Sequence, residues 1–257
     1  MTASTADSAR KPATTGLPVF YSRPEALNPA RHAGLRLVGK PGFGFARVAH
    51  AIPVMAAEMP TAMRSYPIVF VGEQHMPVVI TGLRRDSNLF VEEDGTWTAP
   101  HYVPAYVRRY PFVLAGDEGA ERLTLCIDRD SDRVAESTGD DGEDASPLFD
   151  GDEPSEATKR ALAFCEQYQG MLNATRAVVA KVNEHKLFAD RQSRITLPGG
   201  EELNLTDFQV IDEAALNALP DKAFLHLRKA GALPLIYCHL ASMNSWASLL
   251  HQARPAG

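Results

Sequence analysis

The hydrophobic pattern changes along this chain, and the change limits the folds it can adopt. Before about residue 130, apolar residues come in short runs rich in Val, Ile and Phe, such as Ile68-Val69-Phe70-Val71 and Pro77-Val78-Val79-Ile80. Such runs, bounded by turn residues, predict β-strands. After about residue 154 the apolar residues recur at helical spacing, at Leu162, Cys165, Leu172, Val179 and Val182. The chain is therefore predicted to be α+β, with an antiparallel sheet in its N-terminal half packed with a mostly helical C-terminal half.

In the first half, the pattern predicts strands over residues 35–38, 68–71, 77–82, 88–91, 112–115 and 123–127, and a helical turn or two within 52–63. The segment Tyr102-Val103-Pro104-Ala105-Tyr106-Val107-Arg108-Arg109-Tyr110-Pro111 predicts a helix of about two turns, with Pro104 in its first turn and Pro111 at its exit. Tyr102, Tyr106 and Arg109 would then share one face.

In the second half, residues 154–187 predict the longest helix, with Gly170 as a point where it could break. Residues 195–205 predict a hairpin that turns at Gly199-Gly200. Asp212 is a predicted N-cap for a helix over 213–219, a second helix begins at Pro220, and Gly231 ends it. The apolar segment 235–252 should pack inward.

The composition is that of an ordinary globular protein. Of 257 residues, 45% are hydrophobic and 23% charged, and this length can bury a core without outside staples. Residues 1–18 are predicted to be a disordered tail, and 19–252 a single domain. The acidic stretch 131–146 predicts a mobile surface loop, since it lacks the ligand spacing of an EF-hand.

The charge and the cysteines exclude several classes of partner. The formal net charge is -6, and the basic residues gather only as two pairs, Arg84-Arg85 and Arg108-Arg109, so a nucleic-acid surface is not expected. The two pairs could hold one small anion if the fold joined them. Cys126, Cys165 and Cys238 are far apart and predict reduced, buried thiols. No secretory signal or transmembrane segment is evident, which predicts a cytoplasmic location.

One hypothesis for function is a ligand-binding site around the helix at 102–110. Arg108 and Arg109 would recognise a carboxylate or a peptide segment, because a guanidinium presents a planar fork of donors. Tyr102 and Tyr106 would add apolar area with a polar tip, and His101 lies next to them. The alternative is that the tyrosines are core anchors and the arginines pair with acids.

A second hypothesis is a metal-dependent enzyme resembling a non-haem iron oxygenase. Its ligands would come from His50, Glu58, Glu73, His75 and His101, and Glu73 and His75 would share one face of a strand. The order is reversed from the usual His-x-Asp/Glu, and a surface turn explains Glu73 to His75 equally well. Nucleophilic hydrolysis is weaker still: the chain has no GxSxG motif, and the adjacent side chains of Cys238 and His239 would diverge.

Several segments together resemble the SapC family of bacterial proteins. They are His50-Ala51-Ile52-Pro53 through Phe70, Asn88 to Val91 followed by Trp97, Tyr102 to Phe112, Leu148-Phe149-Asp150, and Phe208 to Leu240. The resemblance covers residues 43–250 and implies an accessory role in nutrient uptake, peptide or substrate modification, or the cell surface. It supplies no catalytic residues and no cofactor. The residues and the resemblance together predict a non-enzymatic binding or accessory protein whose partner is a protein, a peptide or a small carboxylate, with the metal-dependent enzyme as the alternative.

Overall fold

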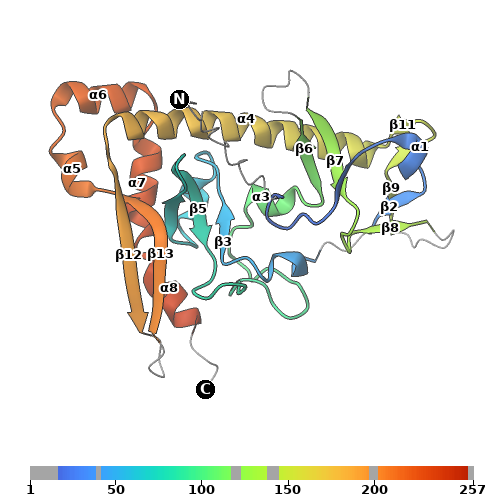
Figure 1. Ribbon diagram of the computed structural model, residues 1–257, viewed down its shortest axis with the longest axis horizontal. Coiled ribbons are helices and arrows are strands. Elements are labelled where there is room, and N and C mark those ends of the chain that lie inside the picture. Colours follow the sequence, from blue (N-terminus) through green and yellow to red (C-terminus); the bar gives the residue numbers. More distant parts are fainter. Residues whose placement is uncertain (1–16, 39–41, 117–122, 138–144, 197–201, 254–257) are drawn as a thin grey trace, which may run out of the picture.

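The computed structural model describes residues 17–38, 42–116, 123–137, 145–196 and 202–253. Its longest element is helix α4 (Glu156–Glu184), which spans much of the molecule, with most of the other elements on one side of it (Figure 1). Ser155 caps α4, because its hydroxyl accepts a hydrogen bond from the Thr158 amide at 3.2 Å. The sequence prediction of this helix is confirmed, and the helix continues through Gly170 without a break.

The largest sheet joins the two halves of the chain. Its five strands lie in the order β12-β13-β4-β5-β3 and all pair antiparallel. Two of the strands come from the C-terminal half, which corrects the prediction of a sheet confined to the N-terminal half. The bounds are β3 (Ala51–Pro53), β4 (Ile68–Val71), β5 (Met76–Ile80), β12 (Phe188–Thr196) and β13 (Glu202–Ile211).

The hairpin of β12 and β13 is much longer than the predicted one. Its turn, including Gly199-Gly200, lies outside the described residues. Only one residue pair, Gln209 with Phe70, connects β13 to β4, so most of the hairpin extends beyond the rest of the sheet (Figure 1).

Three smaller antiparallel sheets lie toward the N-terminal end of α4. The first has the order β1-β7-β6, the second β8-β2-β9, and the third pairs β10 with β11. Their bounds are β1 (Pro24–Ala26), β2 (Leu35–Leu37), β6 (Phe112–Ala115), β7 (Thr124–Asp128), β8 (Val134–Glu136), β9 (Ser146–Pro147), β10 (Phe149–Asp150) and β11 (Glu153–Pro154). The predicted loop at 131–146 was therefore partly wrong: residues 134–136 pair with β2, as does Ser146, while 138–144 lie outside the described residues.

The remaining helices are short. They are α1 (Pro29–His32), the 3-10 helix η1 (Gly44–Ala46), α2 (Met59–Ala62), α3 (Ala105–Arg108), α5 (Glu213–Asn217), α6 (Asp221–Lys229), α7 (Leu233–Ser242) and α8 (Ser245–Gln252). Asp212 caps α5 as predicted, accepting from the Ala215 amide at 3.0 Å. None of the helices in the described ranges has the length and apolar character needed to cross a membrane.

Two predictions around residues 88–111 fail. Residues 88–91 form no strand; Asn88 instead donates to the Ala46 carbonyl at 3.0 Å and accepts from the Phe90 amide at 2.9 Å, so its side chain takes the place of ladder partners. Helix α3 has one turn rather than two and begins after Pro104, because a proline disfavours helical geometry in the residue before it. Tyr102 consequently lies outside the helix.

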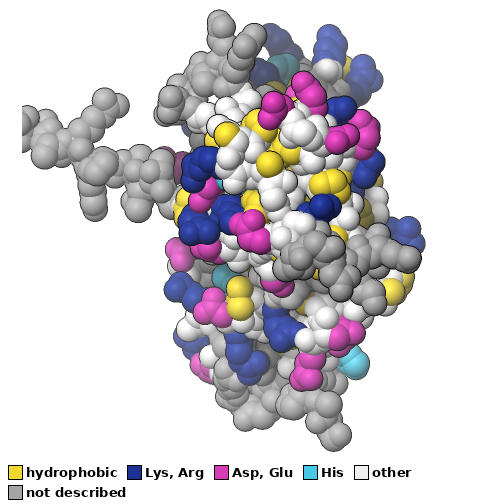
Figure 2. All heavy atoms as spheres, turned by 90° about the vertical axis from the view of Figure 1, so that its right-hand side faces the viewer, with side chains coloured by type: hydrophobic (Ala, Val, Ile, Leu, Met, Phe, Trp, Pro, Cys, Tyr) yellow, Lys and Arg dark blue, Asp and Glu magenta, His cyan; other side chains and the backbone are white. Residues whose placement is uncertain are grey.

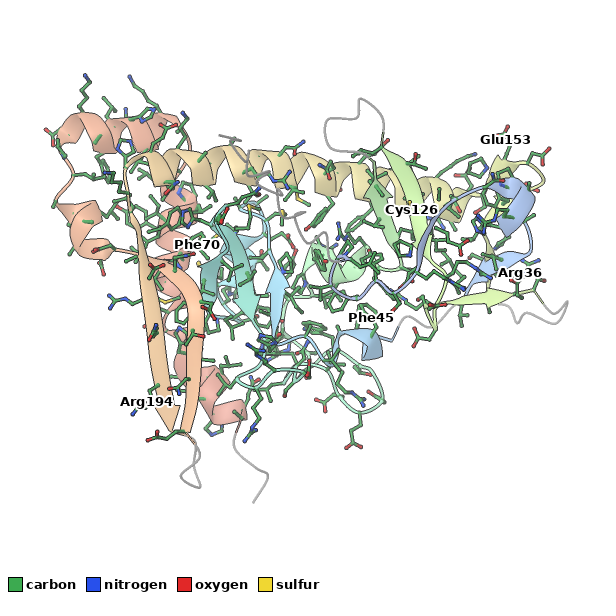
Figure 3. The ribbon with its side chains drawn as sticks, in the orientation of Figure 1. Arg36, Phe45, Phe70, Cys126, Glu153 and Arg194 are labelled. Carbon is green, nitrogen blue, oxygen red and sulfur yellow. The ribbon has the colours of Figure 1, made fainter. Side chains whose placement is uncertain are left out.

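Buried side chains form three hydrophobic clusters. The main cluster surrounds the five-stranded sheet and includes Phe70 (Figure 3). The second, beneath the N-terminal part of α4, comprises Leu35, Phe112, Leu125, Ile127, Leu148, Phe149 and Cys165. The third comprises Tyr21, Tyr110, Val113 and Cys126. All three cysteines are free and buried, as predicted.

Candidate functional site

Four arginines converge on one pocket of about 340 Å³. Arg108 is the last residue of α3 and Arg109 follows it, Arg133 lies just before β8, and Arg160 lies in the first turns of α4. We call this the arginine pocket; it is lined by Leu37, Val38, Arg108, Arg109, Tyr110, Pro111, Phe112, Arg133, Arg160, Ala161 and Phe164. None of the described residues that line it is acidic.

Arg109 is fixed by tyrosine rings rather than by a carboxylate. Its guanidinium carbon lies 4.2 Å from the ring centre of Tyr106, 4.5 Å from that of Tyr168 and 5.7 Å from that of Tyr21. These are cation–π distances. Its Nε is buried and has no hydrogen-bond partner. The tyrosines therefore orient the guanidinium without neutralising its charge.

Arg108 is held by the residues that precede its helix. Its Nε donates to the Val103 carbonyl at 3.1 Å, and its Nη2 donates to the Tyr102 hydroxyl at 3.1 Å. That hydroxyl in turn donates to Oε1 of Glu58 at 2.8 Å. Burial, with Glu58 nearby, raises the pKa of Tyr102 to about 12, so the phenol stays protonated at neutral pH. Tyr102 thus separates the Arg108 charge from the carboxylate.

Arg133 and Arg160 complete the pocket. Nη1 of Arg133 donates to the Tyr110 carbonyl at 2.6 Å, and burial lowers the pKa of Arg133 from its ordinary value. Arg160 is exposed on α4. Across the described ranges, no carboxylate lies within ion-pair distance of any of the four guanidinium groups.

This arrangement is unusual for a chain with a net charge of -6. On the end of the molecule formed by α1, β2 and β8 to β11, acidic and basic side chains are interspersed (Figure 2). Like charges around one cavity repel one another, and an anion in the cavity would remove that repulsion. Guanidinium groups also form strong, charge-assisted hydrogen bonds with carboxylate and phosphate. The chemistry of the pocket is therefore that of an oxyanion receptor.

Of the residues that the sequence predicted for ligand binding, some line the arginine pocket and others lie beside it. Arg108 and Arg109 line the pocket, Tyr102 holds Arg108, and Tyr106 stacks on Arg109 while its hydroxyl donates to the Val19 carbonyl at 3.2 Å. His101 and Tyr102 line an adjoining cavity of about 740 Å³ that shares Arg108 with the arginine pocket. The alternative held that the tyrosines are core anchors and that the arginines pair with acids. Tyr106 is buried in the main cluster and Tyr102 packs against it, whereas neither Arg108 nor Arg109 has an ion pair in the described ranges.

Arg133 and Arg160 were missed in the sequence as members of this site. Arg133 carried a signal, as the only base in an acidic segment, but nothing in the sequence placed it opposite α3. Arg160 is one of many charged residues on a long helix. The other predicted pair, Arg84-Arg85, does not join the pocket, because Arg85 lines a separate cavity with His50.

The proposed metal ligands are dispersed. Across the described part of the chain, no three His, Cys, Asp or Glu side chains form a group that could hold a metal ion. His50, His75 and His101 line three different cavities. Glu73 and His75 lie in the turn between β4 and β5, where His75 stacks on Phe188 with ring centres 4.3 Å apart.

Glu58, the remaining proposed ligand, has a structural role. Its carboxylate is buried and accepts three hydrogen bonds, from the amides of Met55 and Ala105 at 2.9 and 2.7 Å and from the Tyr102 hydroxyl. His239, next to Cys238, is also fully used: Nε2 accepts from the Ile211 amide at 3.1 Å, and Nδ1 donates to the Ile68 carbonyl at 2.8 Å.

Fold and pocket together define an α+β protein with several small antiparallel sheets around one long helix and an arginine-lined cavity. The model of the SapC family matches residues 27–249, most of the chain, so this protein belongs to the SapC family. No curated protein matches the chain. No solved structure matches it either.

Proposed function

We propose that this protein is a non-catalytic binding protein that holds an oxyanion, a carboxylate or a phosphate, in the arginine pocket. The observation that supports the proposal is the convergence of Arg108, Arg109, Arg133 and Arg160 on one cavity without a paired carboxylate in the described chain. Arginines that gather without a directly paired carboxylate repel one another, so an anion that fills the pocket stabilises the fold. An accessory role, in which the protein presents or retains a charged ligand, is consistent with this chemistry.

The apolar part of the lining limits the ligand further. Phe112, Phe164, Leu37 and Pro111 surround the arginines, and the Arg108 guanidinium carbon lies 5.2 Å from the ring centre of Phe164. A bare inorganic ion would leave these side chains in contact with water. An organic anion, with its charged group at the arginines and its carbon skeleton on these rings, uses the whole pocket.

The test is ligand-induced stabilisation. The full chain is purified in a chloride buffer free of phosphate and carboxylates, and thermal unfolding is followed with succinate, benzoate, phosphate or phenyl phosphate added. A ligand present at about a hundred times its dissociation constant raises the free energy of unfolding by about 2.7 kcal/mol. Comparison of carboxylates with phosphates identifies the preferred head group, and the stabilisation should weaken as the chloride concentration rises.

Two exposed arginines provide the variants. Arg160→Gln and Arg108→Gln each remove one donor fork, and the affinity for the anion should fall roughly ten- to a hundredfold in each, because a hydrogen bond to a charged group contributes about 1.5–3 kcal/mol. Arg194→Gln is the matched control, since Arg194 is exposed on β12 and does not line the pocket. If none of the anions stabilises the wild-type chain, or the three variants respond equally, the proposal is wrong.

A further inference from the structure

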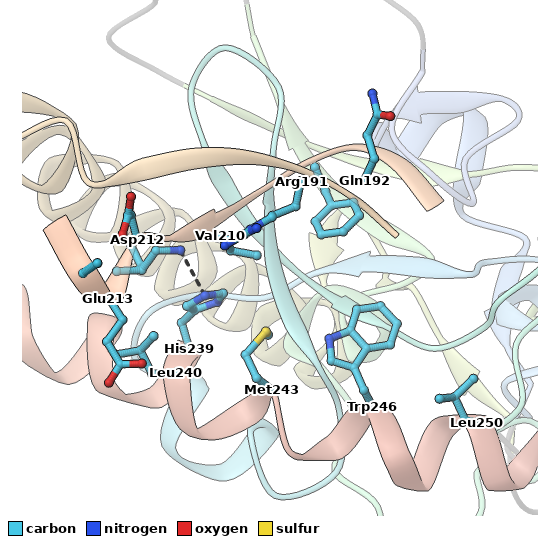
Figure 4. Close-up of a pocket in the computed structure, with 13 residues that line it drawn as sticks. Arg191, Gln192, Val210, Asp212, Glu213, His239, Leu240, Met243, Trp246 and Leu250 are labelled. Carbon is cyan, nitrogen blue, oxygen red and sulfur yellow. Dashed lines mark hydrogen bonds between the residues drawn. The ribbon is translucent and has the colours of Figure 1, made fainter. Parts of the chain in front are cut away.

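A second pocket lies among the C-terminal elements, between the hairpin of β12 and β13 and the helices α7 and α8 (Figure 4). Its volume is about 540 Å³, within the range of small-molecule sites. We call it the apolar pocket; it is lined by Arg191, Gln192, Phe208, Val210, Ile211, Asp212, Glu213, Ala214, His239, Leu240, Met243, Trp246 and Leu250. None of the described residues lines both this pocket and the arginine pocket.

Helices α7 and α8 and strand β13 supply its apolar surface. Leu240, Met243, Trp246 and Leu250 recur every three or four residues and therefore follow one side of α7 and α8 (Figure 4). All four are only partly buried, whereas Leu249 on the same helix is 1% exposed. From β13, Phe208 and Val210 are two residues apart and face the same side.

A bulge shapes the hairpin above the pocket. Arg191 pairs with Phe208 and Ser193 with Leu205, so Thr206 and Asp207 together oppose Gln192. Asp207 has a φ of 65°, in the left-handed region, which aspartate tolerates better than most residues. A bulge bends its strand and re-aims the next side chain, here that of Phe208.

The polar groups of the pocket are few and differ in their availability. Within the described ranges, Arg191 has no carboxylate at ion-pair distance and Trp246 Nε1 donates to no acceptor. Trp246 Nε1 faces along the pocket toward Met243 (Figure 4). His239 has both ring nitrogens bonded, and Asp212 accepts from the Ala215 amide. Asp212 and Glu213 lie at the opposite end from Trp246 and Leu250 (Figure 4).

We propose that the apolar pocket binds a medium-chain aliphatic carboxylate. The alkyl chain lies along Met243, Trp246 and Leu250, and the carboxylate accepts hydrogen bonds from Arg191. A single guanidinium matches a single carboxylate, since it can donate two parallel hydrogen bonds to it. The apolar side chains from Leu240 to Leu250 follow α7 and then α8, so the apolar surface is elongated and suits an extended chain rather than a compact ring. The acids at the far end direct the head group to Arg191 and away from α5.

Trp246 supplies the reporter for a direct test. The chain has two tryptophans, and Trp97 is buried in the main cluster, where its Nε1 donates to the Tyr66 hydroxyl at 3.0 Å. Hexanoate, octanoate and decanoate are titrated into the full chain below their micelle concentrations while tryptophan emission is recorded. The emission should change saturably, and the affinity should rise about fourfold for each added methylene.

Charge variants separate the head group from the tail. Arg191→Gln should weaken decanoate binding at least about tenfold and leave the binding of decanol unchanged. Arg194→Gln, on the same strand but outside the pocket, should bind both as the wild type does. Trp246→Phe should lose the emission change while calorimetry still detects decanoate. Arg191 is exposed, so its substitution tests the site without disturbing the core.

Decanoate that fails to saturate, or that binds Arg191→Gln and the wild type equally, excludes the site as described. Arg160→Gln, which tests the arginine pocket, should not change decanoate binding, so the two proposals can fail independently.

Discussion

At the scale of single residues, Glu58 shows how a candidate ligand can be a structural group. Its two oxygens accept from two amides and one phenol, which ties the start of α3 to the segment before α2. A carboxylate satisfied in this way has little capacity left for a metal ion. It also supports the arginine pocket indirectly, because the Tyr102 hydroxyl that it orients is the group to which Arg108 donates.

We expect Glu58→Gln to lower the free energy of unfolding by about 1–3 kcal/mol. The side-chain NH₂ of the glutamine would replace one carboxylate oxygen and face a buried donor that now bonds to that oxygen. Urea unfolding at neutral pH measures the change. Glu73→Gln is the control: Glu73 is exposed in the turn before β5 and should change stability by less than about 0.5 kcal/mol. Equal effects of the two substitutions would contradict the role given to Glu58.

His239 makes stability depend on pH. Burial lowers its pKa from 6.5 to about 4, and the hydrogen bond from Nδ1 to the Ile68 carbonyl opposes part of that shift. The unfolded chain therefore binds this proton first as the pH falls from about 6.5 toward about 4. Its contribution to stability is complete above that window and decreases within it, by about 2 kcal/mol at about pH 5.

The measurement is urea unfolding of wild type and His239→Gln at about pH 7.5 and about pH 5. The variant has no proton to gain at this position, so its loss between the two conditions should be smaller than that of the wild type by about 2 kcal/mol. His251→Gln, which changes an exposed histidine on α8, should keep the wild-type difference. A wild-type pH dependence in His239→Gln would contradict this assignment.

At the scale of elements, the sequence predicted α4 and the strands β4 to β7 well, because their patterns are local. It failed where a side chain or a distant segment decided the outcome. Asn88 used its amide to bond Ala46 and Phe90, which removed a predicted strand. The five-stranded sheet needed β13 to pair with β4 through Gln209 and Phe70, a contact between residues far apart in the chain. Likewise, only the fold brings Arg133 and Arg160 to Arg108 and Arg109.

Gly170 provides a prediction for α4. A glycine near the middle of a helix predicts a possible break, but α4 is continuous through Gly170. A Cβ added at this exposed position would meet no atom within 4 Å. Gly170→Ala should therefore raise the free energy of unfolding by about 0.5–1 kcal/mol, since alanine loses less backbone entropy on folding. The urea midpoint measures the change. A lower midpoint in Gly170→Ala would show that the helix bends there.

At the scale of the whole molecule, α4 is shared by two hydrophobic clusters. It contributes Cys165 to the second cluster, and Tyr168, Val179 and Val182 to the main cluster. A helix cannot unfold in one cluster without weakening its packing in the other. We therefore expect the chain to unfold as one unit, which is the single-domain prediction made from its length.

Leu148→Ala tests this expectation. Leu148 is fully buried in the second cluster, so its truncation to alanine should lower the free energy of unfolding by about 2–5 kcal/mol. Far-UV circular dichroism reports on all helices and strands, while the emission of Trp97 and Trp246 reports only on the region of the main cluster. Both signals should shift to lower urea together. Two separate unfolding transitions would show that the second cluster belongs to an independently folding unit.

The 29 residues of α4 form a rod about 44 Å long. Arg160 and Phe164 place one proposed ligand near the N-terminal end of α4, and the apolar pocket lies among the elements beside its C-terminal end (Figure 1). Two occupants so placed never touch, and no chemistry passes directly between them. With both proposed sites occupied, the chain would keep two separate ligands apart, an oxyanion near one end of α4 and a medium-chain carboxylate near the other.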